Sequence, residues 1–135
     1  LTNIEPRENG TTFKQNALIK ARFASKLISF AYPTISDDSG ICIENLENKP
    51  GVYSSRWASK NNYSLAFKKI VKNLKSKGIN VNGQYAKFVC IIALIDQNKE
   101  EFVYEGVLKG SLIFPPRGSL GFGYDPIFIP EKSNK

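Results

Sequence analysis

A chain of 135 residues with 41% hydrophobic and 23% charged residues suits one soluble globular domain, because it is long enough for one core and short for two. No apolar run approaches membrane-spanning length and nothing at the amino terminus resembles a signal peptide, so we expect a cytoplasmic protein that does not enter membranes. The absence of histidine excludes Ser-His-Asp and Cys-His catalysis by this chain alone. The net charge of +7 is compatible with an anionic partner, but an overall composition rich in lysine, asparagine and isoleucine explains it at least as well.

Hydrophobic spacing and turn residues predict a chain in which helices alternate with strands, followed by a hairpin. The first helix opens at a capping box that starts with Thr12, and the second ends at Gly78. In chain order we expect a helix over 13–29, strands over 31–36 and 40–46 with a turn between them, a loop over 48–58, a helix over 62–77, paired strands over 84–95 and 101–110, and an irregular tail over 114–130. The fold class that follows is α/β with a mixed sheet.

Two acids, Asp37 and Asp38, stand side by side where the strand over 31–36 is expected to end. On extended backbone their side chains point to opposite faces, so they can meet on one ligand only if the chain turns, which Ser39 and Gly40 permit. A divalent cation would remove the repulsion between them, and Mg²⁺ suits one or two carboxylates together with phosphates and water. The alternative is a purely structural turn.

The segment "GFGYDP", residues 121–126, is a second candidate site. Its glycines allow the backbone to approach a ligand, the Phe122 ring could stack on a nucleobase, and Asp125 could accept hydrogen bonds from the edge of a heterocycle. The alternative is that Phe122, Tyr124 and Phe128 are core aromatics around a tight turn.

A different class of function, a basic nucleic-acid-binding module, would use the charge together with the aromatic side chains of Tyr53, Trp57 and Phe122. It leaves the paired acids unexplained, so we do not expect a nucleic-acid partner. The lysines of the second helix lie mostly off its apolar stripe and suit a solvated face: Lys68, Lys69, Lys72, Lys75 and Lys77. Cys42 and Cys90 lie in apolar strand-like sequence and are expected to be buried free thiols.

Four segments in order, "ENGTTFKQNALIKA", "DDSG", "PGVYSSRWA" and "FGYDPIF", closely resemble the motifs of the Ham1/inosine triphosphate pyrophosphatase family over nearly the whole chain. The resemblance implies Mg²⁺-dependent hydrolysis of ITP, dITP and XTP to the monophosphate and pyrophosphate, which removes non-canonical purine nucleotides. It also implies an elongated, two-lobed α/β fold around a long twisted mixed sheet, and a homodimer.

Carried over by position, the resemblance implies a set of site residues. Asp38 is the expected proton acceptor and metal ligand, with Asp37 beside it and Glu8 as a further metal acid, ahead of the weaker candidate Glu5. The expected substrate contacts are Ser39 and the base pocket formed by Phe122, Gly123, Tyr124 and Asp125.

Family members also begin with a strand and a phosphate loop and end with a Ser-His-Arg segment, and neither is present in this sequence. We therefore expect a single domain over residues 1–135 that is an incomplete version of the family domain. An inactive fragment of the enzyme is the alternative.

Overall fold

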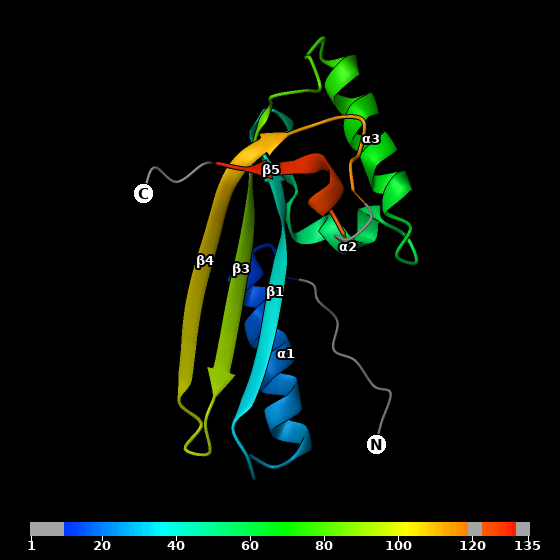
Figure 1. Cartoon of the computed structure of the whole chain (residues 1–135). Helices are drawn as coiled ribbons and strands as arrows, with labels where there is room; N and C mark the ends of the chain where they lie inside the picture. The colour runs from blue at the N-terminus through cyan, green and yellow to red at the C-terminus, as the bar shows by residue number, and fades with distance from the viewer. Residues whose placement is uncertain (1–9, 119–122, 132–135) are drawn as a thin grey trace. The chain divides into compact units, whose positions relative to one another are not determined.

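A computed structural model describes residues 10–118 and 123–131 of the chain (Figure 1). The helices within these ranges are α1 (Phe13–Leu27), α2 (Ser54–Trp57) and α3 (Tyr63–Ser76). The strands are β1 (Thr34–Ile43), β2 (Lys49–Pro50), β3 (Tyr85–Ile95), β4 (Glu101–Leu112) and β5 (Phe128–Pro130). This is the α/β fold that the sequence predicts, with both long helices and the strands β3 and β4 in the expected places.

The described strands form one sheet in the order β2-β1-β3-β4-β5. The pairs β1–β2 and β4–β5 are antiparallel, and Figure 1 shows β3 running opposite to β1 and to β4. The neighbours in the described sheet are therefore antiparallel, and the parallel pair that a mixed sheet requires is not among them. A tight turn joins β3 to β4, with the amide of Asp96 donating to the carbonyl oxygen of Glu100 at 3.0 Å, which confirms the predicted hairpin.

The chain divides into two compact units, residues 1–39 with 90–106 and residues 40–89 with 107–135. In the first unit α1 is held against strands by side-chain contacts. The Ser25 and Thr34 hydroxyl groups lie 2.5 Å apart, and Arg22 makes two hydrogen bonds to the carboxylate of Glu101, at 2.6 and 2.8 Å. The capping box of α1 is partly formed, because the Thr12 hydroxyl accepts from the amide of Gln15 at 3.1 Å.

The second unit contains a continuous hydrophobic core. One side of α3 enters it through Ala66, Ile70 and Leu74, which are all fully buried and lie four residues apart. The other buried members are Ile41, Ile43, Leu46, Ala58, Ala86, Leu112, Tyr124, Ile127 and Phe128. Helix α3 ends at Ser76, just before the predicted stop at Gly78, which adopts a φ of +69° that favours glycine.

Three short elements differ from the sequence prediction. Strand β2 and helix α2 lie within the segment over 48–58 that was expected to be a loop, and β5 lies within the tail over 114–130. β5 is only three residues long and pairs with the end of β4. It is a strand because of this pairing, which the local sequence does not reveal. Within the described residues, no helix is both long enough and apolar enough to cross a membrane.

Candidate functional site

The two acids lie inside a strand and not at its end. β1 runs without interruption from Thr34 to Ile43, so the predicted turn at Ser39 and Gly40 is wrong. Gly40 is not among the residues with positive φ, and the strand continues through it because extended backbone is open to glycine as well as to other residues. The acidic motif therefore belongs to the sheet.

Because the backbone stays extended, Asp37 and Asp38 point to opposite faces of the sheet. Asp37 is exposed, as is Ser39 two residues later on the same face. Asp38 lies on the face that contacts α1, where its side chain is only 14% exposed and its carboxylate lies 3.8 Å from the ammonium group of Lys20. The two carboxylates could reach a single ion together only if this strand were locally broken.

Among the described residues of the first unit, Asp38 is the carboxylate that could take part in a metal site. The described residues contain no group of three or more Cys, Asp or Glu side chains that could hold a metal ion. Mg²⁺ commonly uses one or two protein carboxylates and takes its remaining ligands from substrate phosphates and water, so Asp38 by itself is compatible with such an ion. The other expected acids, Glu5 and Glu8, lie outside the described residues.

The aromatic loop lies in the second unit, and the buried side chain of Tyr124 anchors its described part. Gly123 has a φ of +63°, and the Tyr124 side chain that follows is 5% exposed and packs edge-to-face on the rings of Tyr63 and Phe67, at centroid distances of 5.3 and 6.0 Å. Tyr124 therefore matches the alternative of a core aromatic beside a tight turn. Asp125 begins a short 3-10 turn and is exposed, and Phe122 lies outside the described residues.

Sequence reasoning missed the residue that holds this loop, Ser54. Its backbone carbonyl oxygen accepts a hydrogen bond of 2.6 Å from the Tyr124 hydroxyl, and its own hydroxyl donates to the carbonyl oxygen of Gly51 at 2.6 Å and accepts from the amide of Ile41 at 3.0 Å. Ser54 is 4% exposed, so all three bonds are shielded from water. The only signal in the sequence was its place in "PGVYSSRWA". Through Ser54, the start of the 3-10 turn at Asp125 is tied to the end of β1.

The aromatic side chains of the nucleic-acid hypothesis have cations on their rings. The ammonium of Lys69 lies 4.5 Å from the centroid of the Trp57 ring, and the guanidinium carbon of Arg56 lies 5.2 Å from that of Tyr53. Trp57 also packs against the core and is only partly exposed. A base could stack on these two ring faces only by displacing the cations.

Both cysteines are free. Cys42 is buried, as expected, whereas Cys90 is only partly buried.

Comparison with known proteins gives the family of this α/β chain. The family model described as the Ham1 family matches residues 1–135, and the chain belongs to that family. It is 41% identical over 136 residues to the dITP/XTP pyrophosphatase of Brucella melitensis, covering 97% of this chain and 61% of that protein. It is 43% identical over 129 residues to the enzyme of the same name from Zymomonas mobilis, covering 94% of this chain and 60% of that protein.

Solved structures agree with this assignment. A HAM1 protein from Coxiella burnetii superposes with a TM-score of 0.82 at 40% identity, over 93% of this chain and 63% of that one. A nucleoside-triphosphatase, or dITP/XTP pyrophosphatase, from Mycobacterium abscessus superposes with a TM-score of 0.81 at 35% identity, over 98% of this chain and 66% of that one. The α/β fold of the family, which the resemblance implies, is therefore confirmed. The chain spans about three fifths of the length of the curated relatives it matches.

Proposed function

We propose that this chain belongs to a pyrophosphatase that hydrolyses non-canonical purine nucleoside triphosphates, namely ITP, dITP and XTP. Water attacks, the bond between the α and β phosphates breaks, and the products are the nucleoside monophosphate and pyrophosphate. Beyond family membership, one observation supports the proposal. Asp38 presents a carboxylate that is 14% exposed and close to a lysine, on a rigid strand and not on a loop.

Asp38 is the proposed general base, which takes a proton from the attacking water. A correctly placed base of this kind contributes about 10²–10⁴ in rate. Lys20, whose ammonium lies 3.8 Å from the Asp38 carboxylate, supplies positive charge where a polyphosphate chain needs neutralisation. Ser39 is a proposed substrate contact, and because it lies on the opposite face with Asp37, it would reach the substrate held at Asp38 only if β1 breaks locally.

Mg²⁺ is the proposed cofactor, and when bound it would neutralise phosphate charge during the reaction. Asp38 would hold it, and Glu8 is the proposed further metal acid. Asp37 joins the ligand set only if β1 breaks locally, because its carboxylate points away from that of Asp38 in a continuous strand.

The proposed base pocket consists of Phe122, which stacks on the purine, with Gly123, Tyr124 and Asp125. The buried Tyr124 would act there by fixing the backbone of its neighbours, since its hydroxyl is used by Ser54. Hypoxanthine and xanthine carry an acceptor at position 6, where adenine carries an amino donor. Hydrogen-bond donors that line the pocket would then have no acceptor when ATP is bound, and this disfavours the binding of ATP. We further propose that the protein is a cytoplasmic homodimer whose partner is the nucleotide and not nucleic acid.

The test is pyrophosphate release from ITP and XTP by the 135-residue chain, with and without Mg²⁺ and with ATP for comparison. Asp38→Asn should reduce turnover by about 10²–10⁴. Glu105→Gln, which alters an exposed carboxylate on β4, controls for the loss of one negative charge. Full turnover in Asp38→Asn would remove this residue from the mechanism.

A second measurement separates an inactive fragment from a wrong proposal. Calorimetry should detect binding of ITP in the presence of Mg²⁺ even if the isolated chain does not turn over. Binding without hydrolysis would favour the inactive fragment, whereas the absence of both would contradict the proposed substrate class.

A further inference from the structure

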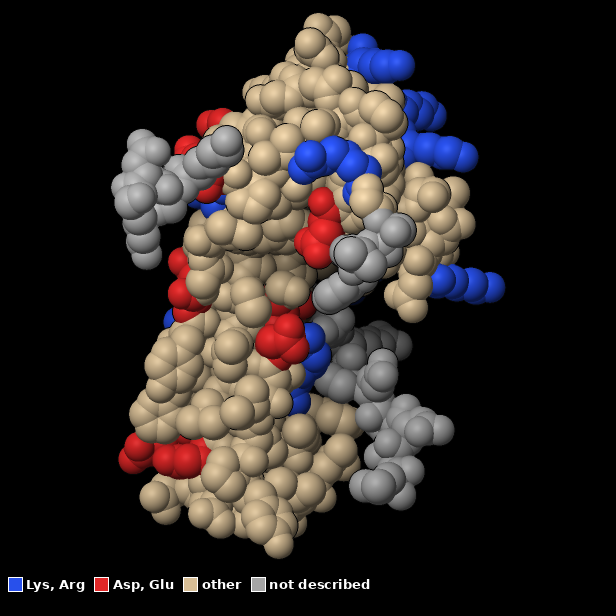
Figure 2. Space-filling model, viewed as in Figure 1, with Lys and Arg blue, Asp and Glu red and all other residues tan. Residues whose placement is uncertain are grey.

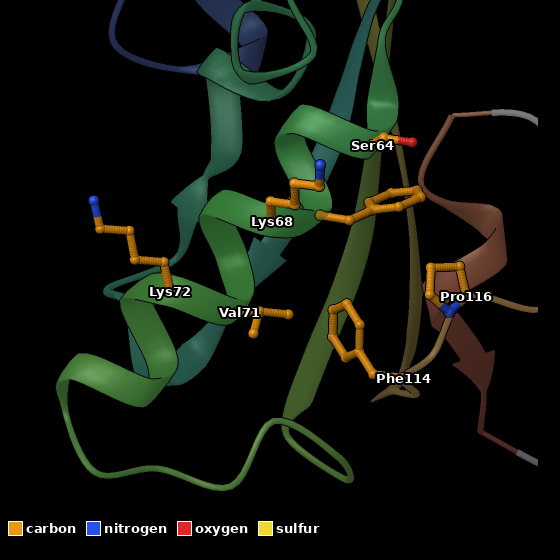
Figure 3. A pocket seen from close by; sticks show the side chains of 7 residues that line it. Ser64, Lys68, Val71, Lys72, Phe114 and Pro116 are labelled. Carbon is orange, nitrogen blue, oxygen red and sulfur yellow. The ribbon is translucent and has the colours of Figure 1, made fainter.

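The second unit contains a pocket that belongs to none of the motifs above. It has a volume of about 370 Å³ and lies between α3 and the segment over 113–118. Figure 3 shows the side chains of Val71, Phe114 and Pro116 directed towards the same space, and Phe67 also lines the pocket. This size is within the usual range of small-molecule sites, which are about 300–1,000 Å³ and mostly apolar.

The walls of the pocket are held in place without a ligand. The ring of Phe67 packs against that of Tyr124, and the amide of Phe114 donates to the side-chain oxygen of Asn82 at 2.5 Å. The amide of Arg117 donates to the carbonyl oxygen of Pro126 at 2.9 Å. Hydrogen bonds at both ends of the segment therefore fix the position of its aromatic and proline side chains, and the cavity is preformed.

The polar groups around the pocket select for negative charge. Ser64, Lys68 and Lys72 complete its lining, one turn of α3 after another. Helix α3 contains no Asp or Glu, and Figure 2 shows blue side chains gathered along the edge of the molecule where this helix lies. In Figure 3 the Lys72 side chain extends away from the cavity, but an exposed lysine on a flexible stem can rotate towards a bound anion.

We propose that this pocket binds a small aromatic anion, with a flat ring system between Phe67 and Phe114 and an acidic group at Lys68 and Lys72. Aromatic rings gain favourable edge and offset contacts with the two phenyl groups. The ammonium groups would make charge-assisted hydrogen bonds to a carboxylate, sulfonate or phosphate, and the Ser64 hydroxyl can add one more. The proposal is independent of the pyrophosphatase activity.

A pair of probes that differ only in charge tests it on the intact chain. The dye 1-anilinonaphthalene-8-sulfonate carries the anionic group, and N-phenyl-1-naphthylamine has the same rings without it. Fluorescence titration should show one saturable site for the sulfonate, bound about tenfold more tightly than the neutral dye. Added salt should weaken binding of the sulfonate and leave that of the neutral dye unchanged.

Paired variants locate the site. Replacing both Lys68 and Lys72 by Gln should weaken the sulfonate about tenfold and leave the neutral dye unaffected. The matched control replaces both Lys75 and Lys109 by Gln. These lysines are exposed and outside the pocket lining, so the affinity for either dye should not change. Phe114→Ala should weaken both dyes. Sulfonate affinity that is unchanged in the Lys68/Lys72 variant, or equal affinity for the two dyes, would overturn the proposal.

Discussion

The Tyr124 hydroxyl donates a hydrogen bond of 2.6 Å to the backbone carbonyl oxygen of Ser54, a residue 70 positions earlier in the chain. The bond is buried, and it connects the loop that carries Gly123 and Asp125 to the segment that leads into α2. Because Ser54 also accepts a hydrogen bond from the amide of Ile41, this serine links the loop to the end of β1. This makes Tyr124 and Ser54 the natural targets for mutation.

Tyr124→Phe should lower the free energy of unfolding by about 0.5–1.5 kcal/mol at neutral pH, because the ring still fits the core but the carbonyl of Ser54 loses its donor. Burial, helped by the nearby Tyr63, raises the pKa of the Tyr124 phenol above its ordinary value of 10.0. The unfolded chain therefore releases this proton first as the pH rises. Stability that the neutral phenol contributes is fully present below about pH 10 and is lost above it.

Urea denaturation between pH 7 and pH 11 measures both effects. Above pH 10 the free energy of unfolding should fall more steeply for the wild type than for Tyr124→Phe, and the two slopes should differ by up to about 1.4 kcal/mol per pH unit. The stability difference between the two proteins therefore narrows. The other tyrosines are common to both proteins and cancel in the difference. A gap that stays constant from pH 7 to pH 11 would show that Tyr124 ionises as easily in the folded protein as in the unfolded chain.

Ser54→Ala should destabilise the protein by about 1–3 kcal/mol, because it leaves the buried amide of Ile41 without its acceptor and the carbonyl of Gly51 without its donor. Ser55→Ala is the matched control, since the neighbouring serine is exposed, and it should change stability by less than about 0.5 kcal/mol. Thermal denaturation followed by circular dichroism compares the two. Equal midpoints would mean that the hydroxyl of Ser54 contributes nothing measurable.

Contacts between residues far apart in the chain explain which features the local sequence could predict and which it could not. Spacing of apolar residues gave α1 and α3 and the β3–β4 hairpin, because each depends on residues close together in the chain. The same reasoning failed at "DDSG", whose composition is typical of a turn, because pairing with distant strands keeps the segment extended. No local pattern could predict the ion pair between Lys20 and Asp38 or the hydrogen bond between Tyr124 and Ser54, because both are tertiary contacts.

The two thiols should react at different rates. Burial raises the pKa of the Cys42 thiol, and the positive charge of Lys87 offsets this only in part, so little thiolate is present near pH 8. Cys90 is only partly buried. Labelling the native protein with a maleimide, followed by peptide mass spectrometry, should find Cys90 modified well before Cys42, and both modified at once in urea. Faster labelling of Cys42 in the native state would contradict the burial described for it.

Gly110 should be the least replaceable glycine of β4. It pairs with Pro130 of β5, and a Cβ atom there would overlap the carbonyl oxygen of Ile129 and come within 2.5 Å of the Phe128 ring. Both obstacles belong to the short strand that closes the sheet, so Gly110→Ala should separate β5 from β4 at a cost of about 1–3 kcal/mol. Gly106→Ala is the control within the same strand, because a Cβ atom there meets no heavy atom within 4 Å.

The control should be neutral or slightly stabilising, since alanine reduces the freedom of the unfolded chain. Amide hydrogen exchange gives the sharper readout, because the amide of Glu131 donates to the carbonyl oxygen of Lys109 at 2.8 Å, beside the pairing of Gly110 with Pro130. Exchange at Glu131 should accelerate in Gly110→Ala and not in Gly106→Ala. If both variants exchange alike there, the close packing of Phe128 over Gly110 is not what holds β5 on the sheet.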